Sequence, residues 1–275
     1  MTINCKGKLI DLSVPKVMGI LNITPDSFYD GGRYENETDI LRRTEKMLNE
    51  GAAFIDVGAY SSRPGAEHVS EEEELRRVVP VIALLVKHFP EILISVDTFR
   101  AVVAKACIQE GAAIINDIAS GNLDKNMIST VAELQVPYIM MHMKGTPQNM
   151  QQDPQYKDIT KEVLYYFSEK VAGARKAGIN DLIIDPGFGF AKTLAHNYEL
   201  MSKLELLHHL ELPLLVGISR KSMIYKLLKN RPKDALNGTT ALNTIALSKG
   251  AHILRVHDVK EAVECVKLVE QLQGE

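Results

Sequence analysis

The chain of 275 residues is 45% hydrophobic and 24% charged, a composition that excludes a disordered or fibrous protein. Its net charge of -3 gives no general reason to bind nucleic acid or an anionic membrane surface. Three separated cysteines, no apolar leader and no uncharged apolar run of about 18 residues argue against disulfides, a zinc site, a signal peptide and a membrane span, so we expect a cytoplasmic protein.

Short apolar runs rich in Ile, Val, Leu and Met recur along the chain, and each ends in polar or glycine residues. They lack the strict alternation of a half-buried strand, which is typical of parallel strands buried on both faces. In chain order, these runs predict eight strands within residues 16–24, 52–61, 92–99, 112–121, 137–145, 181–189, 212–221 and 251–259.

Between the strands, apolar residues recur at the three- and four-residue spacing of amphipathic helices. The segment that contains Val78, Ile82 and Leu85 is one example. Ser70 followed three residues later by Glu73 forms a capping box, which predicts that a helix begins directly after Ser70.

Strands and helices alternate over residues 1–275 without a linker rich in Pro, Gly or Ser, which predicts one parallel α/β domain. The length is close to the roughly 250 residues of a single (β/α)₈ TIM barrel, and eight strands favour that closed form. An open doubly wound sheet is the alternative. No G-x-G-x-x-G follows a strand to indicate a dinucleotide site.

Each predicted strand ends in polar residues, and in a barrel the carboxyl ends of the strands meet at one mouth. Asp and Asn are rare in strands, and a buried carboxylate without partners is costly, so their repeated placement predicts a ligand cavity. A structural role is the alternative for any single residue, above all for Asp56, Asp117 and His142. The strand-end residues are Asn22, Asp56, Asp97, Asn116, Asp117, His142, Lys144, Asp185, Arg220, Lys221, Arg255 and His257.

These residues and the segment 61–65 fall into two chemical groups. Acceptors mixed with donors suit a flat heterocycle with a hydrogen-bonding edge, whereas Arg suits phosphate oxygens, so we predict a phosphorylated substrate. Asn22 offers a hard oxygen to Mg²⁺, although a loop cap is the alternative. The mixed group is Asp97, Asn116, Asp185 and Lys221, and the donor-rich group is Asn22, Ser62, Arg63, Arg255 and His257.

A series of motifs spans nearly the whole chain: GILNITPDSFYDGG, SSRPGAE, SVDTF, NDI, DPGFGFAK, GISRKS, ALNGTTA and RVHDV. In this series the chain resembles the dihydropteroate synthases, pterin-binding TIM-barrel transferases of folate biosynthesis that sulfonamides inhibit. The resemblance implies that 6-hydroxymethyl-7,8-dihydropterin pyrophosphate condenses with p-aminobenzoate and releases pyrophosphate. It also implies Mg²⁺ as cofactor and a homodimer formed through the outer helices.

The resemblance further implies a role for individual residues. The pterin-binding set is Asp97, Asn116, Asp185, Lys221, Met140, Phe190 and Gly217. The pyrophosphate-binding set is Asn22, which also ligates Mg²⁺, with Ser62, Arg63, Arg255 and His257. The p-aminobenzoate-binding set is Phe28, Pro64, Lys221 and Ser222. The predicted catalytic set is Asp97, Asp185, Lys221 and Arg63. Asp97 and Asp185 stabilise the pterin cation, Arg63 stabilises the departing anion, and Lys221 positions the amine.

Two residues depart from the family pattern. Tyr60 stands where the family usually has Glu, so the role of that Glu is not carried over, and Ser62 stands where it usually has Thr and keeps the hydroxyl without the methyl. Two other interpretations stay open. One is a barrel like the methyltetrahydrofolate:corrinoid methyltransferases, which bind the heterocycle but need no pyrophosphate, and the other is a catalytically silent pterin-binding homologue. Arg63 and the stretch 219–222 favour the synthase.

Overall fold

The computed structural model describes residues 1–23, 33–60, 69–146, 150 and 154–274. The eight predicted strands are present and pair in parallel. They are β3 (Lys16–Asn22), β4 (Phe54–Gly58), β5 (Ile94–Asp97), β6 (Ile114–Asp117), β7 (Tyr138–Met141), β8 (Leu182–Asp185), β9 (Leu215–Val216) and β10 (Ile253–Val256).

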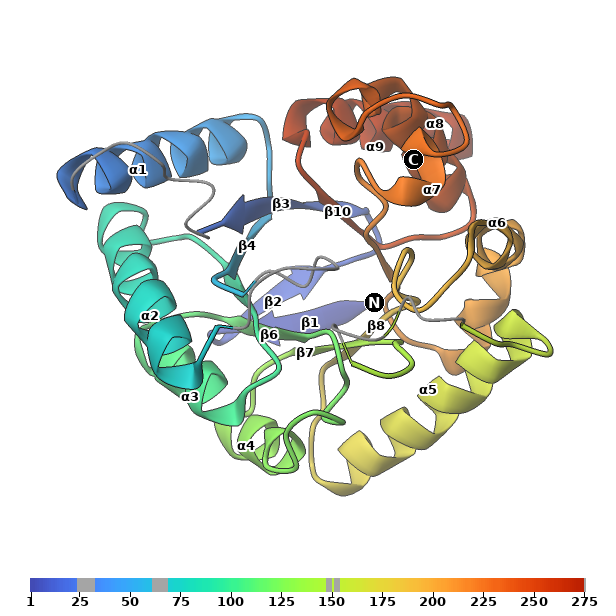
Figure 1. Ribbon diagram of the computed structural model, residues 1–275. Helices are drawn as coiled ribbons and strands as arrows, with labels where there is room; N and C mark the ends of the chain where they lie inside the picture. Colours follow the sequence, from blue (N-terminus) through green and yellow to red (C-terminus); the bar gives the residue numbers. More distant parts are fainter. Residues whose placement is uncertain (24–32, 61–68, 147–149, 151–153, 275) are drawn as a thin grey trace.

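The strands form one sheet in the order β8-β7-β6-β5-β4-β3-β10-β9. A parallel bridge between Ile184 of β8 and Leu214, next to β9, joins the two ends of that order. The sheet is therefore closed into a (β/α)₈ TIM barrel, and Figure 1 shows the helices as a ring around the strands.

Helices cover the outside of the barrel, and their apolar faces form a large core against the strands. Helix α2 begins at Glu71 as predicted, where the Ser70 hydroxyl accepts a hydrogen bond from the Glu73 N–H at 3.2 Å. The α-helices are α1 (Arg33–Asn49), α2 (Glu71–His88), α3 (Ala101–Gln109), α4 (Met127–Leu134), α5 (Ile159–Lys176), α6 (Leu194–Ser202), α7 (Ser222–Tyr225), α8 (Leu236–Ser248) and α9 (Val259–Gln273). The 3₁₀ helices are η2 (Leu204–Leu210) and η3 (Pro232–Asp234).

An antiparallel hairpin that the sequence analysis did not predict precedes the barrel, formed by β1 (Thr2–Cys5) and β2 (Lys8–Asp11). Ile3 of this hairpin packs in one cluster with residues near the starts of the barrel strands, such as Met18 and Phe54. The hairpin therefore closes the amino-terminal end of the barrel, and the carboxyl ends of the strands are left for the site. Among the described residues, no helix has the length and apolar character needed to cross a membrane.

The register between strands aligns the predicted site residues. Asn22 pairs with Gly58, Gly58 with Asp97, and Asp97 with Asn116, so these four residues form one row across β3, β4, β5 and β6. A Cβ on Gly58 would lie 3.3 Å from the Cβ of Asp97, so glycine at this position leaves room for the neighbouring carboxylate.

Candidate active site

Arg255 links carboxylates from two other strands at the mouth of the barrel. Its Nε donates to Asp56 Oδ2 at 2.6 Å, and its Nη2 donates to Asp97 Oδ2 at 2.8 Å. The Nδ2 of Asn116 donates to the same Oδ2 of Asp56 at 3.2 Å. Residues of β4, β5, β6 and β10 thus form one hydrogen-bonded network, and Asp56 at its centre is fully buried.

The charges of this network do not cancel, because one guanidinium faces two carboxyl groups. Burial raises the pKa of Asp97 above its usual range, and Arg255 opposes that effect. Burial acts to lower the pKa of Arg255, but Asp56 and Asp97 raise it overall, so this side chain stays protonated. The network suits a ligand that brings hydrogen-bond donors or positive charge.

Asp185 and Lys221 form a second part of the site, on either side of the turn that follows β8. The N–H of Gly187 donates to Asp185 Oδ1 at 2.8 Å, and Lys221 Nζ donates to the carbonyl oxygen of Phe188 at 2.6 Å. The ring of Phe190 lies 4.6 Å from Lys221 Nζ, a cation–π contact. This turn therefore contacts both ionisable groups.

The charges of Asp185 and Lys221 depend on each other. Burial lowers the pKa of Lys221 to about 8, and Asp185 opposes the shift. Burial raises the pKa of Asp185, and Lys221 is the largest opposing influence. Asp185 is buried and Lys221 is half-buried, and each favours the charged form of the other.

Gly217 joins the two parts of the site. A Cβ at this position would lie 3.7 Å from the Cβ of Arg255 and 3.9 Å from Asp185 Oδ2. The backbone at Gly217 therefore lies beside residues of both parts of the site.

Met140 does not face this site. Alternate residues of a strand face opposite sides, and Met140 packs in the core between barrel and helices. Its neighbour Met141 pairs with Asp185 in the register of β7 and β8, and a Cβ on Gly187 would lie 3.2 Å from its Cγ. We therefore replace Met140 with Met141 as the methionine that faces the site. The sequence alone could not show which of these two consecutive methionines faces the site, because both are apolar and lie in an apolar strand.

Comparison with known proteins agrees with the family resemblance of the sequence motifs over nearly the whole chain. A family model described as a pterin binding enzyme matches residues 18–257. A dihydropteroate synthase of Escherichia coli strain K12 is 49% identical over 272 residues, which are 98% of this chain and 96% of that protein. The chain belongs to the dihydropteroate synthase family.

Solved structures of dihydropteroate synthases have the same fold. The Yersinia pestis enzyme in complex with a sulfonamide drug is 46% identical and superposes with a TM-score of 0.93 over 100% of both chains. The Xanthomonas albilineans enzyme with 4-aminobenzoic acid is 39% identical, with a TM-score of 0.92 over 100% of this chain and 98% of that chain.

The residues predicted for pyrophosphate are only partly within the described chain. His257 lies beside Ser219, whose Oγ is 3.2 Å from the His257 backbone nitrogen and 3.1 Å from its Nδ1. Asn22 ends β3 in the row described above and is half-buried. Within the described residues no three His, Cys, Asp or Glu side chains gather to hold a metal ion. The predicted residues Phe28, Ser62, Arg63 and Pro64 lie outside the described residues.

Three other strand-end residues have structural partners. Asp117 accepts from the N–H groups of Ala119 and Gly121 and from the Tyr138 hydroxyl, and so holds a turn. His142 is buried, and Arg220 pairs with a carboxylate of the next strand–helix loop. Asp56, which the sequence placed among the strand-end residues without a ligand role, is the centre of the network. The feature of the sequence that points to Asp56 is a carboxylate inside an otherwise apolar strand.

Tyr60, where the family usually has Glu, makes aromatic contacts. Its ring packs edge-on against Phe99 with 5.1 Å between centroids, and the guanidinium carbon of Arg100 lies 5.5 Å from its centroid. Arg100 in turn pairs with buried Glu74 and donates from Nη2 to the Val69 carbonyl oxygen at 2.7 Å. An aromatic ring thus lies beside a guanidinium at a position where the family has a carboxylate.

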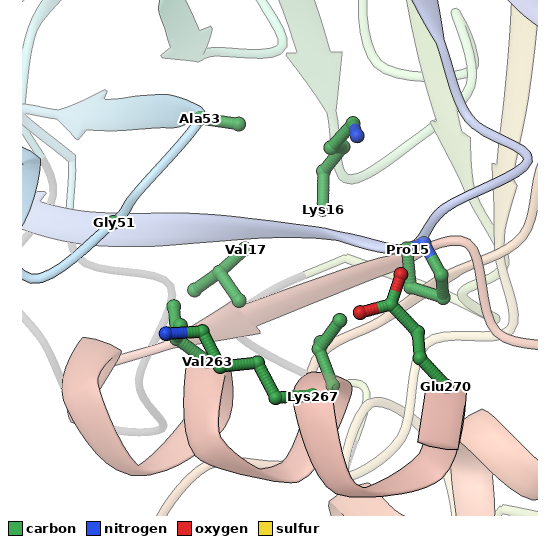
Figure 2. A pocket seen from close by; sticks show the side chains of 9 residues that line it. Pro15, Lys16, Val17, Gly51, Ala53, Val263, Lys267 and Glu270 are labelled. Carbon is green, nitrogen blue, oxygen red and sulfur yellow. The ribbon is translucent and has the colours of Figure 1, made fainter. Parts of the chain in front are cut away.

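A hollow of about 210 Å³ lies outside the barrel, between the start of β3 and helix α9. Figure 2 shows Val263, Lys267 and Glu270 of α9 together with Pro15 and Lys16 around it. Lys16 begins β3, whereas the network of Arg255 lies at the opposite, carboxyl ends of the strands. This hollow is therefore separate from the candidate active site.

Proposed function

We propose that this chain condenses 6-hydroxymethyl-7,8-dihydropterin pyrophosphate with p-aminobenzoate to give 7,8-dihydropteroate and pyrophosphate. The observation that carries the proposal is the network of Arg255, Asp56, Asp97 and Asn116 beside the pair of Asp185 and Lys221. It brings carboxylates, an amide and an ammonium together at the strand ends, which suits the hydrogen-bonding edge of a pterin. Family membership and the sulfonamide and 4-aminobenzoic acid complexes of relatives support the same substrates.

The proposed reaction begins when the C–O bond at the pterin methylene breaks and its electron pair leaves with pyrophosphate. Positive charge then spreads into the pterin ring, where Asp97 and Asp185 stabilise it. The lone pair of the neutral aromatic amine forms the new C–N bond, and the proton of the resulting ammonium passes to solvent. Because the amine attacks as the neutral species, orientation rather than a strong base is the main requirement.

The departing pyrophosphate needs positive charge and donors. Arg63, Ser62, Arg255 and His257 are the proposed partners, and Arg255 already joins Asp56 and Asp97 at the edge of the pterin site. The amide oxygen of Asn22 fits Mg²⁺, an ion that takes few protein ligands and completes its shell with phosphate and water. Mg²⁺, when bound, supplies charge that stabilises the leaving group.

We further propose that two copies of the chain associate through the segment from α7 to α9. Helix α8 packs against both α7 and α9. The segment carries large apolar side chains on its surface, including Leu227 at 52%, Ile245 at 43% and Leu272 at 83% exposure. Size-exclusion chromatography with light scattering tests this proposal. We expect the mass of a dimer for wild type and the mass of a monomer for the Leu227→Glu, Ile245→Glu double variant.

The direct test of function is the release of pyrophosphate from the pterin substrate, measured with and without p-aminobenzoate. We expect release that depends on p-aminobenzoate and an equal yield of dihydropteroate. Pterin binding without turnover would favour a silent homologue instead. Methyl transfer to a corrinoid would favour the methyltransferase alternative.

A further inference from the structure

Lys192 is a buried lysine with no role in the reaction described above. The residue is 4% exposed, and its Nζ donates to the carbonyl oxygens of Gly187 at 2.9 Å and Phe190 at 3.0 Å. A third carbonyl oxygen, that of His142, lies at 3.3 Å. Its partners in the described part of the chain are thus backbone carbonyls and an imidazole rather than a carboxylate. A buried ammonium is tolerated only with such acceptors around it.

The imidazole beside Lys192 is neutral. His142 Nδ1 lies 3.0 Å from Lys192 Nζ. Burial lowers the pKa of His142 to about 2, and the charge of Lys192 acts in the same direction. A neutral imidazole can accept a hydrogen bond at Nδ1, so His142 serves as a fourth acceptor. Burial also lowers the pKa of Lys192 well below its usual range, and Asp185 opposes that shift.

The carbonyls that Lys192 holds connect the turn of residues 187–190, after β8, to the end of β7. Gly187 has a φ of +68°, and a Cβ there would lie 2.1 Å from the His142 carbonyl oxygen. Only glycine allows so close an approach at this backbone conformation. Lys192 therefore bridges two strand ends that are already in contact.

The same turn contacts both ionisable groups of the second part of the site. The Phe188 carbonyl accepts from Lys221, the Phe190 ring lies over Lys221 Nζ, and the Gly187 N–H donates to Asp185. The carbonyls of one short turn are thus divided between two lysines. Those of Gly187 and Phe190 face Lys192, and that of Phe188 faces Lys221.

We propose that Lys192 is a positioning residue of the pterin site, which fixes the 187–190 turn so that Lys221 and Asp185 are held ready for the substrate. The inference rests on the proposed function. Lys192 acts through the turn and not by contact with substrate. Its positive charge also opposes the effect of burial on the pKa of Asp185, which favours the carboxylate needed beside a pterin cation.

The first measurement is the Kd of a pterin probe, pterin-6-carboxylate, for wild type and Lys192→Met, a variant of similar shape without charge or donors. We expect binding about tenfold weaker or more, the size of a lost charge-assisted hydrogen bond. Lys203→Met is the matched control, because Lys203 pairs with Glu199 at 2.8 Å on the nearby helix surface. The control should bind the probe like wild type.

The pH profile of probe binding separates positioning from a general loss of structure. Lys221 is faced by Asp185 of β8, Arg255 of β10 and Asp97 of β5, and its pKa is about 8. Ionisation of the pterin ring itself affects all variants alike, so the contribution of Lys221 is the difference between wild type and Lys221→Met. We expect wild type to lose more affinity than Lys221→Met as the pH rises through about 8. In Lys192→Met the turn loosens and Lys221 gains solvent, so we expect the midpoint to move upward.

Circular dichroism establishes which variants are folded. Lys192→Arg keeps a cation and donors, and we expect it to recover part of the affinity. Lys192→Gln, which has no charge, replaces Lys192→Met if the latter does not fold. A folded variant without the cation that keeps the wild-type Kd and the wild-type pH midpoint overturns the inference. Failure of the proposed function is a different result, because wild type itself would then release no pyrophosphate.

Discussion

Arg220 and Asp258 are joined by two parallel hydrogen bonds, Nε to Oδ2 at 2.8 Å and Nη2 to Oδ1 at 2.7 Å. Arg220 adopts a φ of +56°, a conformation that non-glycine residues seldom take, directly before Lys221. Asp258 directly follows His257. The ion pair thus ties the loop after β9 to the loop after β10, and both loops carry predicted substrate-binding residues.

Asp258→Asn keeps the shape of the side chain but removes its charge. Because Asp258 is 17% and Arg220 26% exposed, we expect the free energy of unfolding to fall by about 2 kcal/mol. Lys221 and Ser222 follow Arg220, so KM for p-aminobenzoate should rise. Urea unfolding and steady-state kinetics measure both effects. Asp39→Asn is the control, since its partner Arg42 is 75% exposed and such pairs contribute under about 0.5 kcal/mol.

Asp97→Asn removes a carboxylate that we expect to stabilise the pterin cation. Its effect should appear mainly in kcat, with a fall of roughly 100-fold, because the charge matters most in the transition state. Lys221→Ala, by contrast, should weaken the binding of both substrates. Steady-state kinetics distinguishes the two patterns. An unchanged kcat in a folded Asp97→Asn variant would show that the carboxylate does not stabilise the cation.

The barrel could be predicted from the sequence because each of its strands is a buried apolar run. Helix α2 could be predicted because Ser70 marks its start. The β1–β2 hairpin was missed, since its first strand is four residues long and its turn is Lys6-Gly7 rather than Asn-Gly or Asp-Gly. Uniformly apolar strands also conceal which face each residue takes, so the sequence did not distinguish Met140 from Met141.

The site residues could be predicted as a set, because polar residues at strand ends are unusual, but not their pairing. Arg255 joins Asp56 and Asp97, which precede it by 199 and 158 residues. That contact depends on barrel closure and on the register of four strands. The burial of Lys192 was even harder to predict from the sequence, since a single lysine after a glycine-rich stretch is usually exposed to solvent.

Gly187→Ala tests the close contact between the strand ends that meet at His142. The new Cβ would meet the His142 carbonyl oxygen at 2.1 Å at a φ of +68°, so the turn must move. We expect a loss of pterin binding and of more than about 2 kcal/mol of unfolding free energy. Gly178→Ala is the matched control, with a φ of +92° and nothing within 4 Å of the Cβ, and should cost only about 1 kcal/mol. Equal losses in the two variants would mean that backbone strain alone explains the effect.

His252 should make stability depend on pH. Burial, with a smaller effect of His208, lowers the pKa of His252 from 6.5 to about 4, and Nδ1 accepts from the Leu214 N–H at 3.1 Å. As the pH falls, the unfolded chain therefore binds this proton before the folded chain does. The contribution of neutral His252 to the free energy of unfolding is fully present above pH 6.5 and decreases as the pH falls to about 4. Because His252 is only half-buried and solvent screens the effect, the loss should be no more than about 1 kcal/mol. His252→Asn keeps an acceptor that does not titrate, and urea unfolding should show a shallower fall between pH 7 and 4. The same slope in wild type and variant would contradict the assignment.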